Sequence, residues 1–353
     1  MRRVKVALLG ATGMVGQNFL RMLASNPFFE VRNLVGYTSV GKKYGEAVEW
    51  IVSQNIPEEY IDKIVFESNP KKIDAEIVFS ALPGNVARDI ESQFSEAGFP
   101  VISNASAYRL EKDVPLIVPE INVEHLELIK IQKRNRKWDG FIVTNPNCST
   151  IALVLALKPI HDLLKIKRVF VTTMQAVSGA GYPGVPSLKI IDNVIPFIEQ
   201  EEEKMETETL KILGKFNGEK IDYANIKISA SCNRVPVIDG HMESVYVETE
   251  EKVDIEEVKE ALRKFKGKPQ ELNLPTAPKD TIIVREEKDR PQPRMDRLSG
   301  TVPGMSIVVG RIRHGMDDKS LKFIVLGHNT IRGAAGSTIL IGELMYKLGL
   351  LEV

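Results

Sequence analysis

The chain is organised around the stretch Asn145-Pro146-Asn147-Cys148-Ser149-Thr150. The residues before it, Phe141–Thr144, have the pattern of a strand, and the apolar run after it, ending near Pro159, has the pattern of a buried helix. We therefore expect Cys148 at a helix N-terminus, where free N–H groups and the helix dipole favour a thiolate. A lone cysteine is more often a small core residue. This position instead favours a nucleophile for acyl transfer.

Length and composition predict two globular domains. The chain has 353 residues, of which 43% are apolar and 27% charged. Lys plus Arg equals Asp plus Glu at 47 each, so no net charge recruits nucleic acid or a membrane. No run of about 18 apolar residues is present to span a bilayer. The two cysteines, Cys148 and Cys232, have no metal-ligand spacing, so we expect a cytoplasmic protein without a metal.

The N-terminal segment has the pattern of a dinucleotide-binding unit. A strand from Val4 to Leu9 leads into Gly10-Ala11-Thr12-Gly13-Met14-Val15-Gly16 and a helix to about Ala24. Glycines permit a tight turn and a close approach of backbone to a diphosphate, and helix N–H groups bind the phosphates. The spacing is G-x-x-G-x-x-G, so a glycine-rich turn without a ligand is the alternative. The order strand, loop, helix favours the dinucleotide.

The next strand, Val31 to Gly36, ends where NAD enzymes usually place an acidic residue for the ribose 2′-hydroxyl. This chain has hydroxyls and lysines there instead, including Thr38, Ser39 and Lys42. These groups suit a 2′-phosphate and favour NADP, although a solvated basic loop is the alternative. Further apolar strands alternate with helices, which predicts a doubly wound parallel sheet. Leu82 follows one of these strands, Ile77 to Ala81, in a loop expected beneath the cofactor.

Polar residues follow several other predicted strands. Arg109 comes shortly after Val101–Ser103 and could bind a phosphate or carboxylate, or lie on the surface. Gln175 follows the strand Arg168 to Met174 and precedes a glycine-rich loop that begins at Ser178-Gly179. So many glycines indicate that this loop approaches a ligand, with a plain connector as the alternative.

The second half adds two pairs of polar residues. Glu201 and Lys204 share one face at the start of a helix, where they could meet an ammonium and a phosphate or simply complement the helix dipole. Arg234 and His241 flank an apolar turn, and His241 could be a general acid/base or a solvated histidine. The sequence does not indicate a role for the charged, proline-rich loop from Arg285 to Leu298.

The C-terminal segment begins with Asn329 and continues as a long apolar helix to Leu348. An asparagine and small residues at a helix start suit a segment that returns to the cofactor domain and closes over the nicotinamide.

Together these motifs, with Asn329-x-x-Arg332-Gly-Ala-Ala-Gly, resemble the archaeal and fungal branch of the aspartate-semialdehyde dehydrogenase family over nearly the whole chain. The resemblance implies an α/β fold with an NADP-binding Rossmann domain (1–147), an α/β catalytic and dimerisation domain with a mixed sheet (148–328), and a C-terminal helix (329–353) that packs back on the first domain. It also implies a homodimer or homotetramer.

The resemblance further implies reversible, NADP-dependent and phosphate-dependent oxidation of L-aspartate 4-semialdehyde to 4-phospho-L-aspartate. In cells the reaction runs reductively toward lysine, threonine, methionine and isoleucine. The implied catalytic residues are Cys148 as nucleophile, His241 as proton carrier and Gln175 as the group that orients the carbonyl. The implied substrate-binding residues are Arg234 for the α-carboxylate, Glu201 for the α-ammonium, and Arg109, Lys204 and Asn147 for phosphate. The implied cofactor residues are Gly10, Ala11, Thr12, Gly13, Met14, Val15, Thr38, Ser39, Lys42, Leu82, Ser178, Gly179 and Asn329.

Three other functions remain as alternatives. Malonyl-CoA reductase shares the architecture but would not need Glu201 with Arg234. N-acetyl-glutamyl-phosphate reductase carries a different nucleophile motif from Asn147-Cys148-Ser149. A non-catalytic NADP-binding sensor would be expected to lose the nucleophile or its acid/base partner, and both are present.

Overall fold

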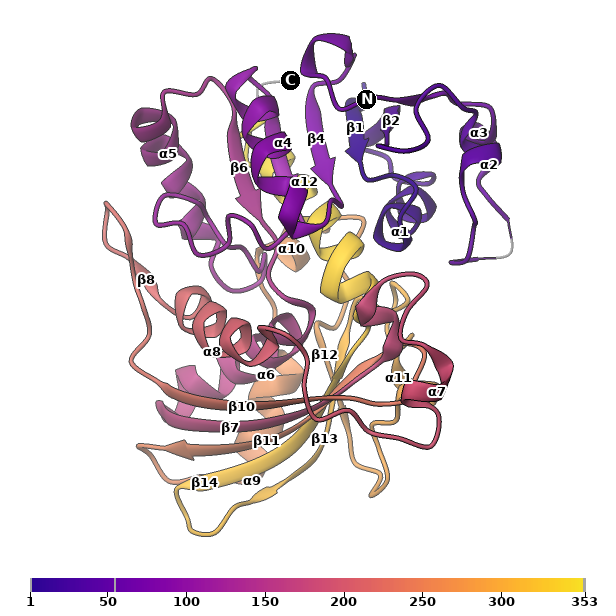
Figure 1. The fold of residues 1–353 in the computed structure, drawn as a ribbon. Coiled ribbons are helices and arrows are strands. Elements are labelled where there is room, and N and C mark those ends of the chain that lie inside the picture. Colours follow the sequence, from indigo (N-terminus) through magenta and orange to yellow (C-terminus); the bar gives the residue numbers. More distant parts are fainter. Residues whose placement is uncertain (1, 54, 352–353) are drawn as a thin grey trace.

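The computed structural model describes residues 2–53 and 55–351. It has an upper domain built on a parallel sheet and a lower domain built on a mixed sheet (Figure 1). None of the helices in the described residues is long and apolar enough to cross a membrane.

The first sheet has the strand order β3-β2-β1-β4-β5-β6, and all its pairs are parallel. This order is that of a Rossmann fold, so the predicted doubly wound sheet is confirmed. The strands are β1 (Val4–Leu9), β2 (Phe29–Val35), β3 (Val65–Phe66), β4 (Ile77–Ser80), β5 (Pro100–Ser103) and β6 (Phe141–Thr144). Helix α1 (Met14–Leu23) covers one face and α4 (Gly84–Glu96) the other, while α5 (Leu128–Arg136) precedes β6.

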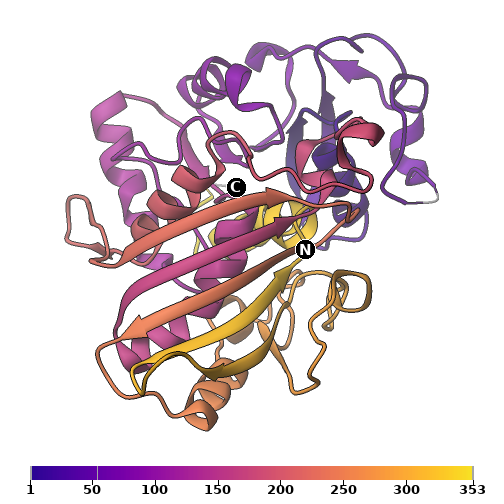
Figure 2. The same ribbon diagram turned by 60° about the horizontal axis from the view of Figure 1, so that its bottom comes forward.

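The second sheet has the order β10-β7-β11-β14-β13-β12 and is mixed. Its strands are β7 (Ile166–Gln175), β10 (Lys227–Arg234), β11 (His241–Thr249), β12 (Ile282–Arg285), β13 (Ile307–His314) and β14 (Ser320–Gly327). Residues of α6 (Cys148–Leu164), α8 (Glu201–Ile212) and α9 (Ile255–Lys264) share a hydrophobic core with one face of this sheet. Figure 2 shows the strands side by side in front of these helices. Exposure alternates along β7, as expected for a sheet with one packed face.

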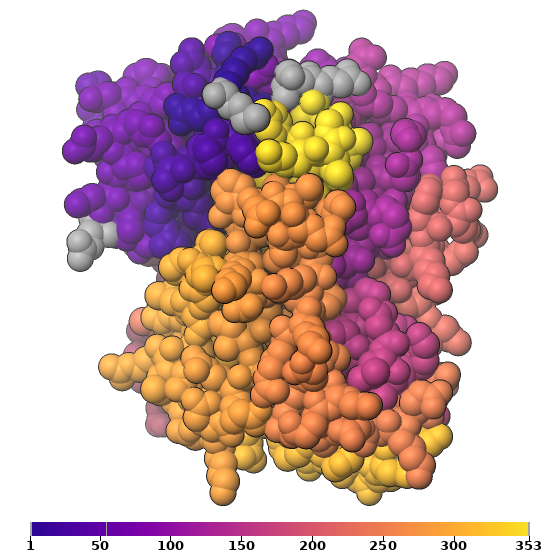
Figure 3. All heavy atoms as spheres, turned by 180° about the vertical axis from the view of Figure 1, so that it is seen from behind, coloured from indigo at the N-terminus to yellow at the C-terminus, as the bar shows by residue number. Residues whose placement is uncertain are grey.

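The C-terminal helix α12 (Gly336–Lys347) returns to the first domain, as predicted. Its Gly342 lies so close to Phe79 of β4 that an added Cβ would come 2.8 Å from the ring. Seen from behind, the yellow C-terminal residues lie against the indigo N-terminal domain, above the orange segment of the second domain (Figure 3). The helix therefore joins the two halves of the chain.

One local prediction was wrong, and two other segments contain local structure that the sequence did not predict. Helix α6 does not end near Pro159 but continues to Leu164, because its apolar face is buried along the second sheet and tertiary packing outweighs one missing N–H bond. The C-terminal helix is preceded by a π-helical turn, Ile331–Ala335. The loop from Arg285 to Leu298 contains a short helix, α11 (Pro293–Asp296).

Candidate active site

Cys148 is the first residue of α6 and follows β6 through the Asn-Pro-Asn turn, as the sequence predicted. Asn147 caps the helix: its Oδ1 accepts hydrogen bonds from the N–H groups of Ser149 (2.9 Å) and Thr150 (3.1 Å). Its Nδ2 donates to Oε1 of Glu201 at 2.9 Å. The cap therefore fixes the start of α6 and connects it to the start of α8.

The sequence predicted a thiolate at Cys148, but the free protein carries a protonated thiol there. Although Cys148 is partly exposed, burial raises the pKa of its thiol to about 12, and Glu201 adds to the rise while Arg109 and Arg234 oppose it. The sequence predicted a thiolate from the helix N-terminus alone. Desolvation outweighs that effect, so the thiol is protonated at neutral pH in the free protein.

The π-helical turn Ile331–Ala335 lies directly on the nucleophile. A Cβ on Gly333 would come 2.6 Å from the Cβ of Cys148 and 3.0 Å from its Cα. The Nδ2 of Asn145 also reaches the carbonyl oxygen of Gly333, at 3.4 Å. Only glycine fits at this position, so the C-terminal segment forms one wall of the thiol site.

The predicted residues of the second sheet meet at neighbouring strand ends. Arg234 ends β10 and pairs with Gln175 at the end of β7, and His241 begins the next strand, β11. The Nη1 of Arg234 donates to the carbonyl oxygen of Ala176 at 2.7 Å. The Nε2 of Gln175 donates to Oγ1 of Thr173 at 3.3 Å. Sheet register thus places an arginine, an amide and an imidazole in one row.

His241 is set up as a hydrogen-bond donor. Its Nδ1 accepts a hydrogen bond from the N–H of Ala176 at 3.0 Å, so the neutral ring must carry its proton on Nε2. That Nε2 is buried without a partner in the described residues. Burial holds the pKa of His241 well below its usual value, and Arg234 and His328 lower it further. The neutral imidazole therefore presents an unused N–H.

Two of the predicted phosphate-binding residues, Arg109 and Asn147, already have hydrogen-bond partners within the protein. Arg109 pairs with Glu208 at 3.1 Å and donates to the carbonyl oxygen of Asn104 at 2.8 Å. Glu208 also accepts from the N–H of Asn147 at 2.6 Å. Lys204 is half-buried on α8, one turn after Glu201. Because the side-chain oxygen and nitrogen of Asn147 are both occupied, its role in this structure is to cap α6 and hold Glu201.

The glycine loop fits a dinucleotide. Gly10 has φ +74°, and a Cβ there would come 2.7 Å from the carbonyl oxygen of Ala81. A Cβ on Gly16 would come 2.2 Å from the carbonyl oxygen of Gly10. Helix α1 has Gly13 as its N-cap and no side-chain cap, so the amides at its start, including Met14, remain available for phosphate.

The other predicted cofactor residues lie around this loop. Ala11 and Thr12 belong to the loop itself, and Val15 lies in the first turn of α1. Leu82 lies beside the loop, because its backbone nitrogen would be 3.3 Å from a Cβ added to Gly10. Thr38 and Lys42 are exposed and Ser39 is buried after β2. Across the domain junction, Asn329 donates from Nδ2 to Oγ of Ser178 at 2.7 Å and accepts from the N–H of Gly240 at 2.9 Å.

Sequence reasoning missed one buried acid, Glu243. Its side chain is fully buried and neither carboxylate oxygen has a hydrogen-bond partner among the described residues. Burial raises the pKa of Glu243 well above its usual value, and Glu201 raises it further. The alternation of β11 puts Glu243 on the same face as His241, two residues earlier, and that signal could have found it.

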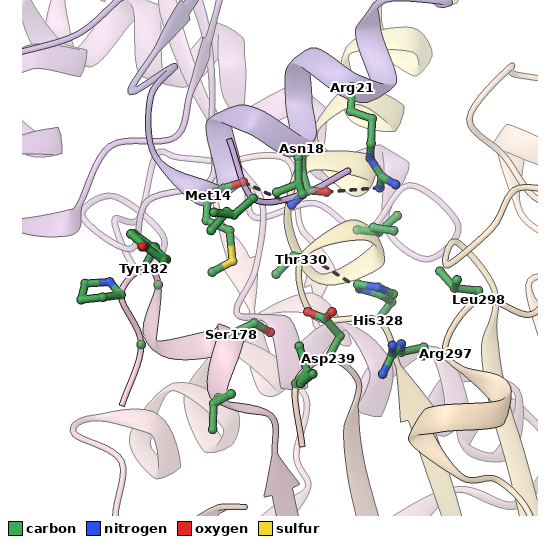
Figure 4. Close-up of a pocket in the computed structure, with 18 residues that line it drawn as sticks. Met14, Asn18, Arg21, Ser178, Tyr182, Asp239, Arg297, Leu298, His328 and Thr330 are labelled. Atoms are coloured by element: carbon green, nitrogen blue, oxygen red, sulfur yellow. Dashed lines mark hydrogen bonds between the residues drawn. The ribbon is translucent and has the colours of Figure 1, made fainter. Parts of the chain in front are cut away.

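Sequence reasoning also missed a cavity of about 340 Å³ between α1 and the second domain. Figure 4 shows the side chains of Arg21, Asp239, Arg297 and His328 around it. The cavity includes Met14 and Ser178 but not Cys148. We place the reaction at Cys148 and not in this cavity, because the predicted nucleophile and the Arg109–Glu208 ion pair lie there.

Comparison with known proteins gives matches along the whole chain. Residues 5–129 match the family model described as the NAD binding domain of semialdehyde dehydrogenase, and residues 157–332 match that of its dimerisation domain. The chain is 60% identical to an aspartate-semialdehyde dehydrogenase of Archaeoglobus fulgidus, over 98% of each chain. It is 43% identical to a malonyl CoA reductase (NADP) of Metallosphaera sedula, over 99% of each. A crystal structure of aspartate-semialdehyde dehydrogenase with NADP from Candida albicans superposes with a TM-score of 0.90 at 41% identity, covering 98% of this chain and 99% of that one.

Proposed function

We propose that this chain, which belongs to the aspartate-semialdehyde dehydrogenase family, reduces 4-phospho-L-aspartate to L-aspartate 4-semialdehyde through a thioester on Cys148. The observation that carries this proposal is the arrangement of charges around the thiol. Asn147, next to Cys148, contacts Glu201 directly and Arg109 through Glu208, and the charges of Glu201, Arg109 and Arg234 all shift the pKa of the thiol. These charges match the ammonium, phosphate and carboxylate groups of aspartyl phosphate. NADPH, when bound, supplies the hydride.

The acyl transfer is assigned to Cys148. Its sulfur forms a bond to the acyl carbon while the carbon–oxygen bond to phosphate breaks, and phosphate leaves with the electron pair and takes up the thiol proton. Arg109 and Lys204 bind that phosphate, and Arg109 is already oriented by Glu208. Asn147 supports them by holding the start of α6.

His241 and Gln175 act on the oxygen of the reacting carbonyl. When hydride reaches the thioester, negative charge develops on this oxygen. The Nε2–H of His241 is an unused donor of the site, and its hydrogen bond stabilises the negative charge on that oxygen. Gln175, at the neighbouring strand end, orients the same carbonyl. Collapse of the tetrahedral alkoxide of the thiohemiacetal breaks the carbon–sulfur bond, which releases the aldehyde and a thiolate that takes up a proton to return the thiol.

Arg234 and Glu201 select the amino-acid head group. The guanidinium of Arg234 binds the α-carboxylate in a fork that lysine does not reproduce, and Glu201 receives the α-ammonium. A CoA thioester of malonate has no ammonium for Glu201. The buried carboxylate of Glu201 therefore favours the aspartyl substrate over malonyl-CoA.

The assembly is proposed to be a homodimer or homotetramer. The second domain matches a dimerisation domain, and the open face of its sheet exposes 47% of Phe170, which packs against Tyr246. We also propose the division into 1–147, 148–328 and 329–353. A cytoplasmic location stays a prediction.

An enzyme assay tests the proposed function. Purified protein is mixed with L-aspartate 4-semialdehyde, phosphate and either NADP or NAD, and the reduced cofactor is followed by absorbance. We expect phosphate-dependent reduction of NADP in preference to NAD. Oxidation of NADPH with malonyl-CoA, without turnover of the semialdehyde, would contradict the proposal and favour the CoA-thioester reaction.

A further inference from the structure

Helix α8 carries a row of buried charged side chains along one face. The row consists of Glu201, Glu208 and Lys211, whose spacing of seven and three residues places them on the same side of the helix. None of the three exposes more than 6% of its surface. Glu201 binds Asn147, and Glu208 binds both Arg109 and the N–H of Asn147. The proposed function gives no role to Lys211.

Lys211 holds the segment that carries Arg109. Its Nζ donates hydrogen bonds to the backbone carbonyl oxygens of Arg109, Glu111 and Val114, each at 2.8 Å. Residues 104–115, all of them described, form neither helix nor strand, so these contacts help to fix their backbone. Burial lowers the pKa of Lys211 to about 8. At pH 7 the side chain is therefore an ammonium, and all three of its N–H groups have acceptors.

Lys211 also changes the charge that Arg109 presents to an anion. Glu208 pairs with Arg109 at 3.1 Å, and this pair alone would be nearly neutral. The carboxylate of Glu208 also raises the pKa of Lys211 against the effect of burial, so the ammonium and the carboxylate attract each other. The three side chains together carry one positive charge, and Nε of Arg109 is buried without a partner among the described residues. An incoming phosphate requires both a positive charge and an unused donor.

The two acids of the same segment do not cancel this charge. Asp113 pairs with Arg136 at 2.6 Å, and Glu111 pairs with Arg88 at 3.0 Å. Both acids are thus balanced by arginines from outside the segment. The positive charge that Lys211 adds next to Glu208 remains available to Arg109.

We propose that Lys211 is a positioning residue for phosphate, because it holds the backbone at Arg109 and offsets the charge of Glu208. This inference rests on the proposed function. In the oxidative direction, an oxygen of inorganic phosphate forms a bond to the acyl carbon of the thioester on Cys148. The carbon–sulfur bond breaks, and the departing thiolate takes up the phosphate proton. The side-chain hydrogen bonds of Lys211 reach the Arg109 segment and not the thiol turn, so Lys211 should affect this step and not formation of the thioester.

Separate measurement of the two half-reactions tests the proposal. Enzyme, L-aspartate 4-semialdehyde and NADP are mixed rapidly without phosphate, and the burst of NADPH reports formation of the thioester. Steady-state assays at increasing concentrations of inorganic phosphate then give kcat and KM for phosphate. In Lys211→Met we expect a burst of unchanged rate and amplitude and a KM for phosphate about 10- to 100-fold higher. KM for NADP should stay the same.

Lys112→Met is the matched control, because Lys112 lies in the same segment and is exposed. It should leave KM for phosphate unchanged. Lys211→Gln keeps two N–H donors for the three carbonyl oxygens and should raise KM for phosphate about 3- to 10-fold. Melting curves identify any variant that is unfolded.

Three results would overturn the proposal. The first is an unchanged KM for phosphate in a folded variant of Lys211, or an equal rise in Lys112→Met. The second is equal slowing of the burst and of the phosphate step. The third is failure of both Lys211 variants to fold, because Lys211 would then support the fold as a whole. A wild type that gives no burst would instead contradict the proposed function.

Discussion

The thiol cluster, defined here as Cys148, Glu201, Arg234 and His241, differs sharply from the loop of residues 37–43. In the cluster, Glu201, Arg234 and His241 expose at most 6% of their surface. In the loop, Thr38 and Lys42 are exposed. Both regions are expected to bind negatively charged groups. Charges in the cluster act in a desolvated site, where a lost partner costs several kcal/mol, whereas exposed charges contribute about 1 kcal/mol or less. Changes in the cluster should therefore have much larger effects.

The largest effect is expected for Cys148→Ser. Serine is a far weaker nucleophile with no base in place to activate it, so the rate of NADP reduction should fall by a factor on the order of 10³ or more. Cys232→Ala is the control, because Cys232 packs its sulfur 3.6 Å from that of Met205 in the core. It should retain activity. Comparable loss in both variants would contradict the assignment of the nucleophile.

The alkylation rate of the free protein tests the charge state of the thiol. Since burial raises the pKa of Cys148 to about 12, the thiolate fraction should rise about tenfold for each pH unit between pH 7 and 10. The rate of modification by iodoacetamide, followed by mass spectrometry of the Cys148 peptide, should rise in proportion. A rate that is already constant near pH 7 would restore the thiolate predicted from the helix N-terminus.

Arg234→Lys should have the next largest effect. Lysine keeps the charge but cannot make the forked contact, so KM for L-aspartate 4-semialdehyde should rise about 10- to 100-fold. KM for NADP should not change. A fall in kcat with an unchanged KM for the semialdehyde would instead indicate that Arg234 acts on the transition state rather than on the head group.

Glu243→Leu should stabilise the protein. The buried carboxyl has no partner within the described residues, so replacing it by an apolar side chain of similar size should raise the free energy of unfolding by about 1–3 kcal/mol at pH 7. Folding raises the pKa of Glu243, so its penalty is absent below the unfolded pKa and grows as pH rises above it. The gain, measured by denaturant unfolding, should therefore be smaller at pH 4 than at pH 7. A gain that does not depend on pH would contradict this explanation.

The smallest effect is expected in the loop of residues 37–43. Lys42→Ala should raise KM for NADP about 2- to 5-fold, and the effect should shrink at high salt, because an exposed charge is screened. Lys43→Ala is the control, since Lys43 already pairs with Asp62 at 2.8 Å. An equal effect in both variants would show that only the general basic character of the loop matters.

The same contrast explains how much could be predicted from the sequence. The nucleophile turn and the glycine loop are local patterns, so their strands, turns and helices could be derived from adjacent residues. The ion pair of Arg109 with Glu208 joins residues 99 positions apart, and no periodicity predicts it. The protonated thiol of Cys148, the buried carboxyl of Glu243 and the cavity beside Arg297 likewise depend on burial. Burial arises only when distant segments pack together.

A burst experiment tests directly whether Cys148 carries the acyl group. The enzyme is mixed rapidly with L-aspartate 4-semialdehyde and NADP in the absence of phosphate, and NADPH formation is followed by absorbance. We predict a burst of about one NADPH per active site that then stops, with the acyl mass on the Cys148 peptide, and turnover that resumes when phosphate is added. Continuous turnover at a rate independent of phosphate, or an acyl mass absent from Cys148, would contradict it.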